Sequence, residues 1–275
     1  MIRPSIVVQS DCGLASTEFC KIAGSIESAV PDTDVVDCNI ALEKGNVPQA
    51  SAFLYTVLPF WPDGTIFLSL VGEGRPVAVR TSSGSVIVTP DNGTATMCIR
   101  SFGFGGARLL SAQEGADARL QLAAFAAKLS AGDDFARLGS ELKESDLTLL
   151  PTPASRIGKG RAEGEVSMVL RTFGNLTFSI GTDEFEDTGI RHGDPVRVTF
   201  TRGSRIEWQG DMTFQPSFGY VPEGAPVLFN GSSGYIDIGL NRRSFVQECL
   251  PQVAAAGTDP GDFKVIVEKT GEQKK

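Results

Sequence analysis

Four short segments of this 275-residue chain combine a glycine with an acidic, amide or hydroxyl side chain, and each follows a strand-like run. They are residues 10–13 (SDCG), 90–93 (PDNG), 173–176 (FGNL) and 231–241 (GSSGYIDIGLN). Polar loops with a flexible glycine at the ends of strands are typical of ligand-holding segments. Because each half of the chain contributes two of them, we expect one cavity lined by both halves.

Asp11 follows the first predicted strand, residues 5–9, at the edge where α/β sheets bind ligands. Its carboxylate can accept hydrogen bonds from both hydroxyls of a ribose. An aspartate here can equally cap the next helix or close a turn. The residues alone leave these interpretations open.

The second half of the chain carries groups suited to a nucleobase. Asn175 has both a donor and an acceptor for a base edge, and the ring of Phe173 offers a stacking face. Without further information, Phe173 and Phe218 read more often as core residues. The N–H groups and hydroxyls of residues 231–234 can hold a carboxylate. Residues 90–93 suit a turn, and we assign them to architecture.

Composition narrows the function classes. With 41% hydrophobic and 21% charged residues the chain is an ordinary globular protein, and its formal net charge of −8 argues against nucleic-acid binding. No apolar run approaches the ~20 residues of a membrane span, and we expect no signal segment before residue 5. The five cysteines are scattered without a CxxC pair, which predicts free thiols in a reducing cytoplasm.

Two further motifs exclude common chemistries. His192 is the single histidine and lies in a turn, residues 191–194, so a histidine-based triad or a histidine-rich metal site is excluded and no metal is expected. Residues 103–106 (GFGG) look like a phosphate loop. They lack both the GxGxxG spacing and the lysine of a Walker motif.

The first half alternates strand and helix patterns. We predict strands at residues 5–9, 35–36 and 65–70, a hairpin of 77–80 with 85–89, and helices at 17–30, 47–58 and 116–129. This order predicts an α/β domain over residues 1–150, with a mixed, largely parallel sheet flanked by helices.

The pattern changes after residue 150. Prolines and glycines punctuate residues 151–163, which we predict to be a linker. Beyond it apolar and polar residues alternate with a period of two, as in residues 166–171 and 196–201, and glycine turns separate the short strands. Residues 164–275 are therefore predicted to form an all-β barrel.

In this order the motifs resemble those of the S-adenosylmethionine (SAM) hydroxide adenosyltransferase family, which includes the SAM-dependent chlorinases and fluorinases. The resemblance spans roughly residues 5–268. It implies an α/β domain joined to a β-barrel, and a homotrimer with each site between the N-terminal domain of one chain and the C-terminal domain of its neighbour. It also implies SAM or adenosine as substrate or ligand, with no further cofactor.

The resemblance assigns roles to matching positions. The residues that match the family's substrate-binding positions are Asp11, Ser16, Phe173, Asn175, Phe218, Ser232, Ser233 and Asn241. Asp11 would hold the ribose diol and Ser16 the methionine amine. Phe173, Asn175 and Phe218 would hold adenine. Ser232 and Ser233 would hold the methionine carboxylate, and the backbone around Asn241 the adenine edge. Ser16 replaces a frequent aspartate and could instead cap the next helix. Arg242 stands where the family usually has a small residue.

The family's reactive positions are only partly matched. Its chemistry is displacement at the ribose C5′ of SAM, and its hydrolytic branch places water with an Asp, an Arg and a His. Here Leu70 replaces the Asp and Asp117 the His, while Arg75 and Arg119 match arginines. The halogenases fit no better, although Ala118 occupies their small-residue position.

Three interpretations follow. In the first, Glu73 and Asp117 are replacement carboxylates, oriented by Arg75 and Arg119, and the protein cleaves SAM to adenosine and methionine. The same four residues could instead form surface salt bridges. In the second, the protein binds SAM or adenosine but has lost displacement, and acts as a binding module or catalyses another reaction. In the third, it is a scaffolding oligomer with an empty pocket. We predict a SAM- or adenosine-binding protein, and SAM cleavage as its reaction.

Overall fold

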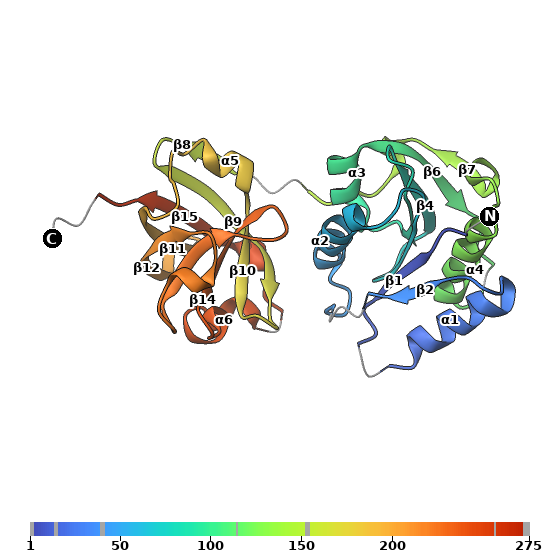
Figure 1. Cartoon of the computed structure of the whole chain (residues 1–275), viewed down its shortest axis with the longest axis horizontal. Coiled ribbons are helices and arrows are strands. Elements are labelled where there is room, and N and C mark those ends of the chain that lie inside the picture. The colour runs from blue at the N-terminus through green and yellow to red at the C-terminus, as the bar shows by residue number, and fades with distance from the viewer. Residues whose placement is uncertain are drawn as a thin grey trace. The chain divides into compact units, whose positions relative to one another are not determined.

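The chain is described by a computed structural model that covers residues 3–13, 16–38, 42–113, 115–151, 155–255 and 257–271. It divides into two compact units, Met1–Pro151 and Thr152–Lys275. Figure 1 shows an α/β unit, coloured blue to green, and a unit of strands, coloured yellow to red. Each has its own hydrophobic core.

The first unit is built around a mixed sheet, which confirms the predicted α/β fold. Its described strands have the order β2-β1-β3-β5-β4-β6-β7. β2, β1, β3 and β5 are parallel, whereas β4 pairs antiparallel with β5 and β6, and β7 with β6. The strands are β1 (Ile6–Ser10), β2 (Val35–Asp37), β3 (Ile66–Leu70), β4 (Pro76–Thr81), β5 (Val86–Pro90), β6 (Phe104–Leu110) and β7 (Gly139–Leu142).

Helices cover both faces of this sheet. Successive residues of a strand point to opposite faces, so Ile6 and Val8 pack with α1 (Glu18–Ala29) and α4 (Ala118–Ser130), while Val7 packs with α2 (Val47–Val57) and α3 (Thr96–Phe102). Figure 1 shows α1 beside α4, and α2 beside α3. Burial on both faces explains why β1 and β3 read as continuous apolar runs.

Three elements of the first unit were not predicted from the sequence: α3, β6 and β7. The glycines of residues 103–106 weakened the strand signal, yet this segment ends α3 and begins β6. Short 3₁₀ helices complete the unit. They are η1 (Leu58–Phe60), η2 (Phe135–Arg137) and η3 (Glu144–Asp146).

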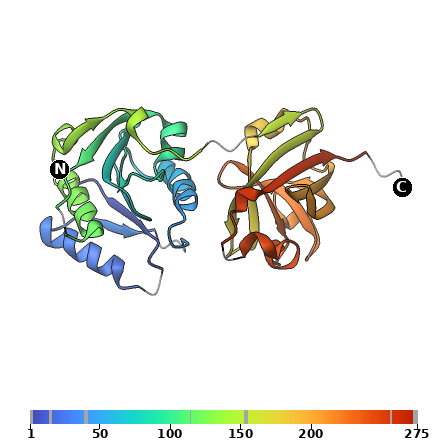
Figure 2. The same cartoon turned by 180° about the vertical axis from the view of Figure 1, so that it is seen from behind.

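The second unit is a closed β-barrel, as predicted. Its sheet has the order β10-β14-β13-β12-β11-β15-β9-β8, and a β9–β10 pairing closes it. Figure 2 shows β15, in red, crossing the barrel. The strands are β8 (Arg156–Gly158), β9 (Arg161–Leu170), β10 (Asn175–Gly181), β11 (Pro195–Arg202), β12 (Arg205–Gln215), β13 (Pro226–Asn230), β14 (Tyr235–Leu240) and β15 (Phe263–Lys269). The helices are α5 (Thr182–Glu186), α6 (Phe245–Glu248), η4 (Phe218–Tyr220), η5 (Pro251–Ala254) and η6 (Pro260–Asp262).

The barrel's alternation decides which face carries polar groups. Leu176 and Phe178 of β10 and Ile236 and Ile238 of β14 belong to the core. Because side chains alternate, the residues between them point outward. Asn175, Thr177, Asp237 and Gly239 therefore lie on the outer face of two adjacent strands.

The range predicted as a linker differs from the structure. Gly158 ends β8 and Gly160 lies in the turn of the β8–β9 hairpin, so residues 156–158 and 161–163 are part of the second unit's sheet. A glycine-rich turn and a glycine-rich linker have the same composition, which is why the sequence did not separate them. Within the described ranges, the helices are too short or too polar to span a bilayer.

Candidate functional site

Asp11 connects three segments of the first unit. Its Oδ2 accepts hydrogen bonds from the backbone N–H of Gly45 (2.9 Å) and of Gly72 (3.1 Å), and its Oδ1 from Arg119 Nη2 (2.8 Å). The side chain is 3% exposed. A carboxylate has about four acceptor positions, so these three bonds leave roughly one for a ligand.

Arg119 has a different partner from the one predicted. Its guanidinium contacts Asp11, Cys12 and, at 3.8 Å, Glu18. Partial burial disfavours the charge, but these three neighbours more than offset it and raise the pKa of Arg119. Asp117, the carboxylate that Arg119 was expected to orient, instead caps α4 by accepting from the N–H groups of Arg119 (2.9 Å) and Leu120 (3.1 Å).

The predicted pairing of Arg75 with Glu73 is also absent among the described residues. Arg75 Nε donates to Asp91 Oδ2 at 2.8 Å, and Arg75 Nη2 donates to the carbonyl of Asp146. Glu73 is exposed and has no polar partner in the described part of the chain. Of the four predicted catalytic residues, Glu73 is therefore the one whose charged group forms no ion pair or hydrogen bond with the described residues.

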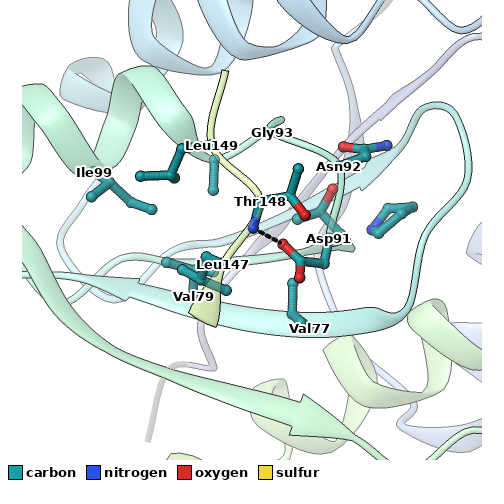
Figure 3. A pocket seen from close by; sticks show the side chains of 12 residues that line it. Val77, Val79, Asp91, Asn92, Gly93, Ile99, Leu147, Thr148 and Leu149 are labelled. Atoms are coloured by element: carbon teal, nitrogen blue, oxygen red, sulfur yellow. Dashed lines mark hydrogen bonds between the residues drawn. The ribbon is translucent and has the colours of Figure 1, made fainter. Parts of the chain in front are cut away.

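Asp91 belongs to the architecture, as its motif suggested. It binds Arg75 and accepts from the N–H of Thr148 at 2.8 Å (Figure 3). The adjoining cavity measures about 10 Å³, space for about one water. This part of the unit is packed rather than open to a ligand.

Ser16 makes a local contact. Its Oγ accepts from the N–H of Glu18 at 3.1 Å, at the start of α1. The N-cap residue of α1 is Thr17, so Ser16 precedes the cap and is not the cap itself, although its hydroxyl accepts from the first N–H of the helix. Leu70, which stands in place of the family's aspartate, is buried at the end of β3.

An open groove on the barrel brings several predicted binding residues together. It measures about 510 Å³, and Phe173, Phe218 and Asn241 line it. Phe173 is 70% exposed, so it is not a core residue. Phe218 packs on Phe229 with ring centroids 4.5 Å apart. A groove of this size with two aromatic side chains suits a nucleoside.

Asn175 is not among the residues that line this groove, but its side chain lies next to Phe218, which does line it. A Cβ at Gly239 would stand 2.5 Å from Asn175 Oδ1 and 2.9 Å from the Phe218 ring, so both side chains converge on this glycine. The side chain of Asn175 is buried, and its Oδ1 has no hydrogen-bond partner among the described residues. A buried amide oxygen without a donor is unusual, because leaving it unpaired costs about 1–3 kcal/mol.

The loop after β13 shows unpaired donors. Gly231 and Gly234 use their N–H groups within the hairpin, whereas no partner among the described residues accepts from the N–H of Ser232 or Ser233. Ser232 is exposed and Ser233 is buried. Two adjacent free N–H groups in a turn can receive an anion.

Asn241 lines the groove, but its side-chain amide and its backbone groups already form hydrogen bonds. Its side chain donates to the carbonyl of Val221 (2.8 Å), its N–H donates to Ala225, and its carbonyl accepts from Gly224. Because the backbone N–H and carbonyl of Asn241 are already hydrogen-bonded, they are not free to bind the edge of adenine.

The sequence analysis missed Asp237 and Gly239. Asp237 is 4% exposed and lies directly beneath Gly231, where a Cβ would approach its carboxyl carbon to 2.6 Å. Burial raises its pKa to about 7. The available signal was an acidic residue inside an apolar strand, three residues after the glycine turn. His192 is exposed, and its ring is tilted against that of Phe214 with centroids 4.6 Å apart.

Arg242 has the strained backbone of this region, with φ at +59°. An L-residue there loses roughly 1 kcal/mol against glycine, and its exposed contact with Glu223 at 3.7 Å returns little. Arg242→Gly is therefore expected to raise the barrel's free energy of unfolding by up to about 1 kcal/mol, measured by urea denaturation with Trp208 fluorescence. Arg205→Gly, in an ordinary strand, is expected to lower it. Equal destabilisation by both would contradict this reading.

The fold and the groove define an α/β domain joined to a β-barrel with a nucleoside-sized site. The SAM hydroxide adenosyltransferase N-terminal domain matches residues 6–145, and the C-terminal domain of the same family matches residues 164–252. The chain belongs to the SAM hydroxide adenosyltransferase family.

Individual relatives cover nearly the same length. A fluorinase from Actinopolyspora mzabensis is 25% identical over 88% of this chain and 92% of its own. An (R)-S-adenosyl-L-methionine hydrolase from Thermus thermophilus is 28% identical over 88% and 94%. An uncharacterized conserved protein from Thermotoga maritima has a similar structure, with a TM-score of 0.79, 24% identity and coverage of 96% of this chain and 100% of its own.

Proposed function

We propose that this protein binds SAM with the adenine in the barrel groove, and cleaves it by displacement at the ribose C5′. The observation that carries the proposal is the unpaired, buried oxygen of Asn175 beside Phe218. It is an acceptor that lacks a donor, and the amino group of adenine supplies one. Membership of a family that includes a fluorinase and a SAM hydrolase supports the reaction class.

The chemistry asks little of the protein. The sulfonium is a good leaving group, so water attacks C5′, the C5′–S bond breaks, and its electron pair stays on sulfur as methionine leaves. The attacking water must be held in line and must lose a proton. Glu73 is our candidate acceptor because its carboxylate is uncommitted, whereas Arg75 and Arg119 are bound to Asp91 and Asp11.

Because most of the predicted catalytic side chains are already used in structural contacts, a second candidate function is a nucleoside-binding protein without displacement activity. Asp117 is used as a helix cap, and Leu70 cannot position water. Incubation with SAM, with and without halide, followed by chromatography, separates the two. Adenosine and methionine as products support cleavage. Calorimetric SAM binding without turnover supports the binding protein.

We also propose a cytoplasmic homotrimer in which the first unit of one chain and the barrel of its neighbour complete each site. Asp11 and Asn175 belong to different units, so the ribose role of Asp11 stays a prediction. Light scattering tests the assembly. A monomer that still turns over SAM would refute the shared site.

Asn175→Leu separates recognition from folding. The substitution removes an unpaired buried oxygen, so the barrel's stability is expected to be unchanged or about 1 kcal/mol higher. Adenosine affinity, measured by calorimetry, is expected to fall roughly 10- to 100-fold. Wild-type protein should prefer adenosine to inosine, which presents a carbonyl where adenine has its amino group, and the variant should lose this preference.

The matched control is Thr89→Val in the first unit, which also removes an unpaired buried oxygen. It is expected to leave adenosine affinity unchanged. Equal adenosine binding by wild-type protein and Asn175→Leu would refute the adenine site.

A further inference from the structure

Asp237 is a buried carboxyl without a cationic partner among the residues that the structure describes. It lies on the outer face of β14, and its Oδ1 has no hydrogen-bond partner in the described part of the chain. Across the sheet it stands opposite Thr177 of β10 and Phe229 of β13, and the backbone of Gly231 covers it. Thr177 Oγ1 is likewise buried without a well-formed hydrogen bond, and its nearness lowers the pKa of Asp237 by less than burial raises it. These neighbours are uncharged.

Tyr235, two residues earlier on the same side of β14, is the titratable group on its own strand. No ionised side chain among the described residues acts on the pKa of Asp237, which burial raises to about 7. Without a ligand, the carboxyl is therefore half-protonated near neutral pH and ionises fully when a cation arrives.

The loop that covers Asp237 is the one with unpaired donors at Ser232 and Ser233. If these N–H groups hold the carboxylate of an amino acid, the ammonium on the same carbon must lie within a few ångströms. Asp237 lies directly beneath Gly231 of this loop, and its carboxyl has no cationic partner among the described residues.

Resting on the proposed function, we propose that Asp237 is a specificity-determining residue that favours ligands with an α-ammonium group at residues 231–234. The proposal adds a named group to the site: the serine N–H groups hold the ligand's carboxylate, and Asp237 balances its ammonium. Adenosine, which lacks both groups, gains nothing from Asp237. An adenosine joined to an amino acid does.

S-adenosylhomocysteine is the probe, because it has the amino acid but no sulfonium leaving group. Calorimetry is run from pH 6 to 8 on wild-type protein and Asp237→Asn, with adenosine as the second ligand. If binding requires the ionised carboxylate, wild-type affinity for S-adenosylhomocysteine rises about tenfold across this range relative to the variant. Adenosine affinity is expected to be equal in both proteins and independent of pH. The ligand's own amine affects both proteins alike, so their ratio isolates Asp237.

The outcomes are distinguishable. If wild-type protein binds neither ligand, the proposed function fails and the inference with it. If it binds both and the wild-type-to-variant ratio for S-adenosylhomocysteine is flat with pH, the inference is overturned while the adenine site stands. If the variant does not fold, proton release decides. Titration of wild-type protein at pH 6.5, in two buffers of different ionisation enthalpy, should show most of one proton released for S-adenosylhomocysteine and none for adenosine. Equal release for both ligands overturns the proposal.

Discussion

Asp11→Ala is expected to destabilise the first unit by about 3–5 kcal/mol. The substitution leaves the partly buried Arg119 without its closest carboxylate and frees two backbone N–H groups, those of Gly45 and Gly72. Denaturation followed by Trp61, which packs against this unit's core, measures the loss. Glu141→Ala is the control. Glu141 is 79% exposed and 3.7 Å from Arg108, so its loss is expected to change stability by less than about 1 kcal/mol.

A local measurement shows whether Asp11 holds the two loops. Hydrogen exchange at the amides of Gly45 and Gly72 is expected to quicken in Asp11→Ala far more than exchange in β6, which lies elsewhere in the sheet. Unchanged exchange at both glycines would show that the carboxylate does not fix these loops. Loss of ligand binding in Asp11→Ala is therefore not enough to assign the ribose role.

The sequence predicted the layers of both units because their signals are periodic. Helix α2 follows Asn46, whose side chain accepts from the N–H of Gln49, and its apolar residues recur at helical spacing. The β4–β5 hairpin and the barrel strands show the alternation of half-buried strands. Such patterns record burial, which depends on local sequence order.

The ion-pair partners of the arginines were less predictable, because they depend on how the chain folds back on itself. Glu73 is close to Arg75 in sequence, but the hairpin pairs Pro76 with Pro90 and so places Arg75 opposite Asp91. The predicted hairpin of residues 77–80 with 85–89 is the observed one, and extending its pairing by two residues places Arg75 opposite Asp91. The Asp11–Arg119 contact joins the end of β1 to the start of α4, and no local pattern encodes it.

The residue types in the sequence indicated a nucleobase site, but they did not show that Asn175 Oδ1 is left without a hydrogen-bond partner. Phe173, Asn175 and Phe218 were identified by their capacity to bind a base. That Asn175 Oδ1 is unpaired follows from Gly239, which lets the amide and the Phe218 ring converge on one point. A sequence shows which groups can form hydrogen bonds, and only packing shows which of them have been left without a partner.

Asp237 should make the barrel's stability depend on pH. Its pKa is raised from an ordinary value of 3.8 to about 7 in the folded protein, so the folded state binds this proton more tightly than the unfolded chain. The stability it contributes is fully present below about pH 4 and is lost as pH rises through 7. At about 1.4 kcal/mol per unit of pKa, the loss is at most roughly 4 kcal/mol.

Asp237→Asn isolates this contribution, because an amide resembles the protonated carboxyl and does not titrate. The variant is expected to match wild-type protein near pH 4 and to be more stable above pH 7, by denaturation followed through Trp208 in a Trp61→Phe background. Parallel stability curves would show that burial does not shift this carboxyl. The direction of the effect matters for function. If Asp237→Asn is more stable than wild-type protein at neutral pH, then the wild-type protein carries a buried negative charge that destabilises it, and a cationic ligand would remove this cost.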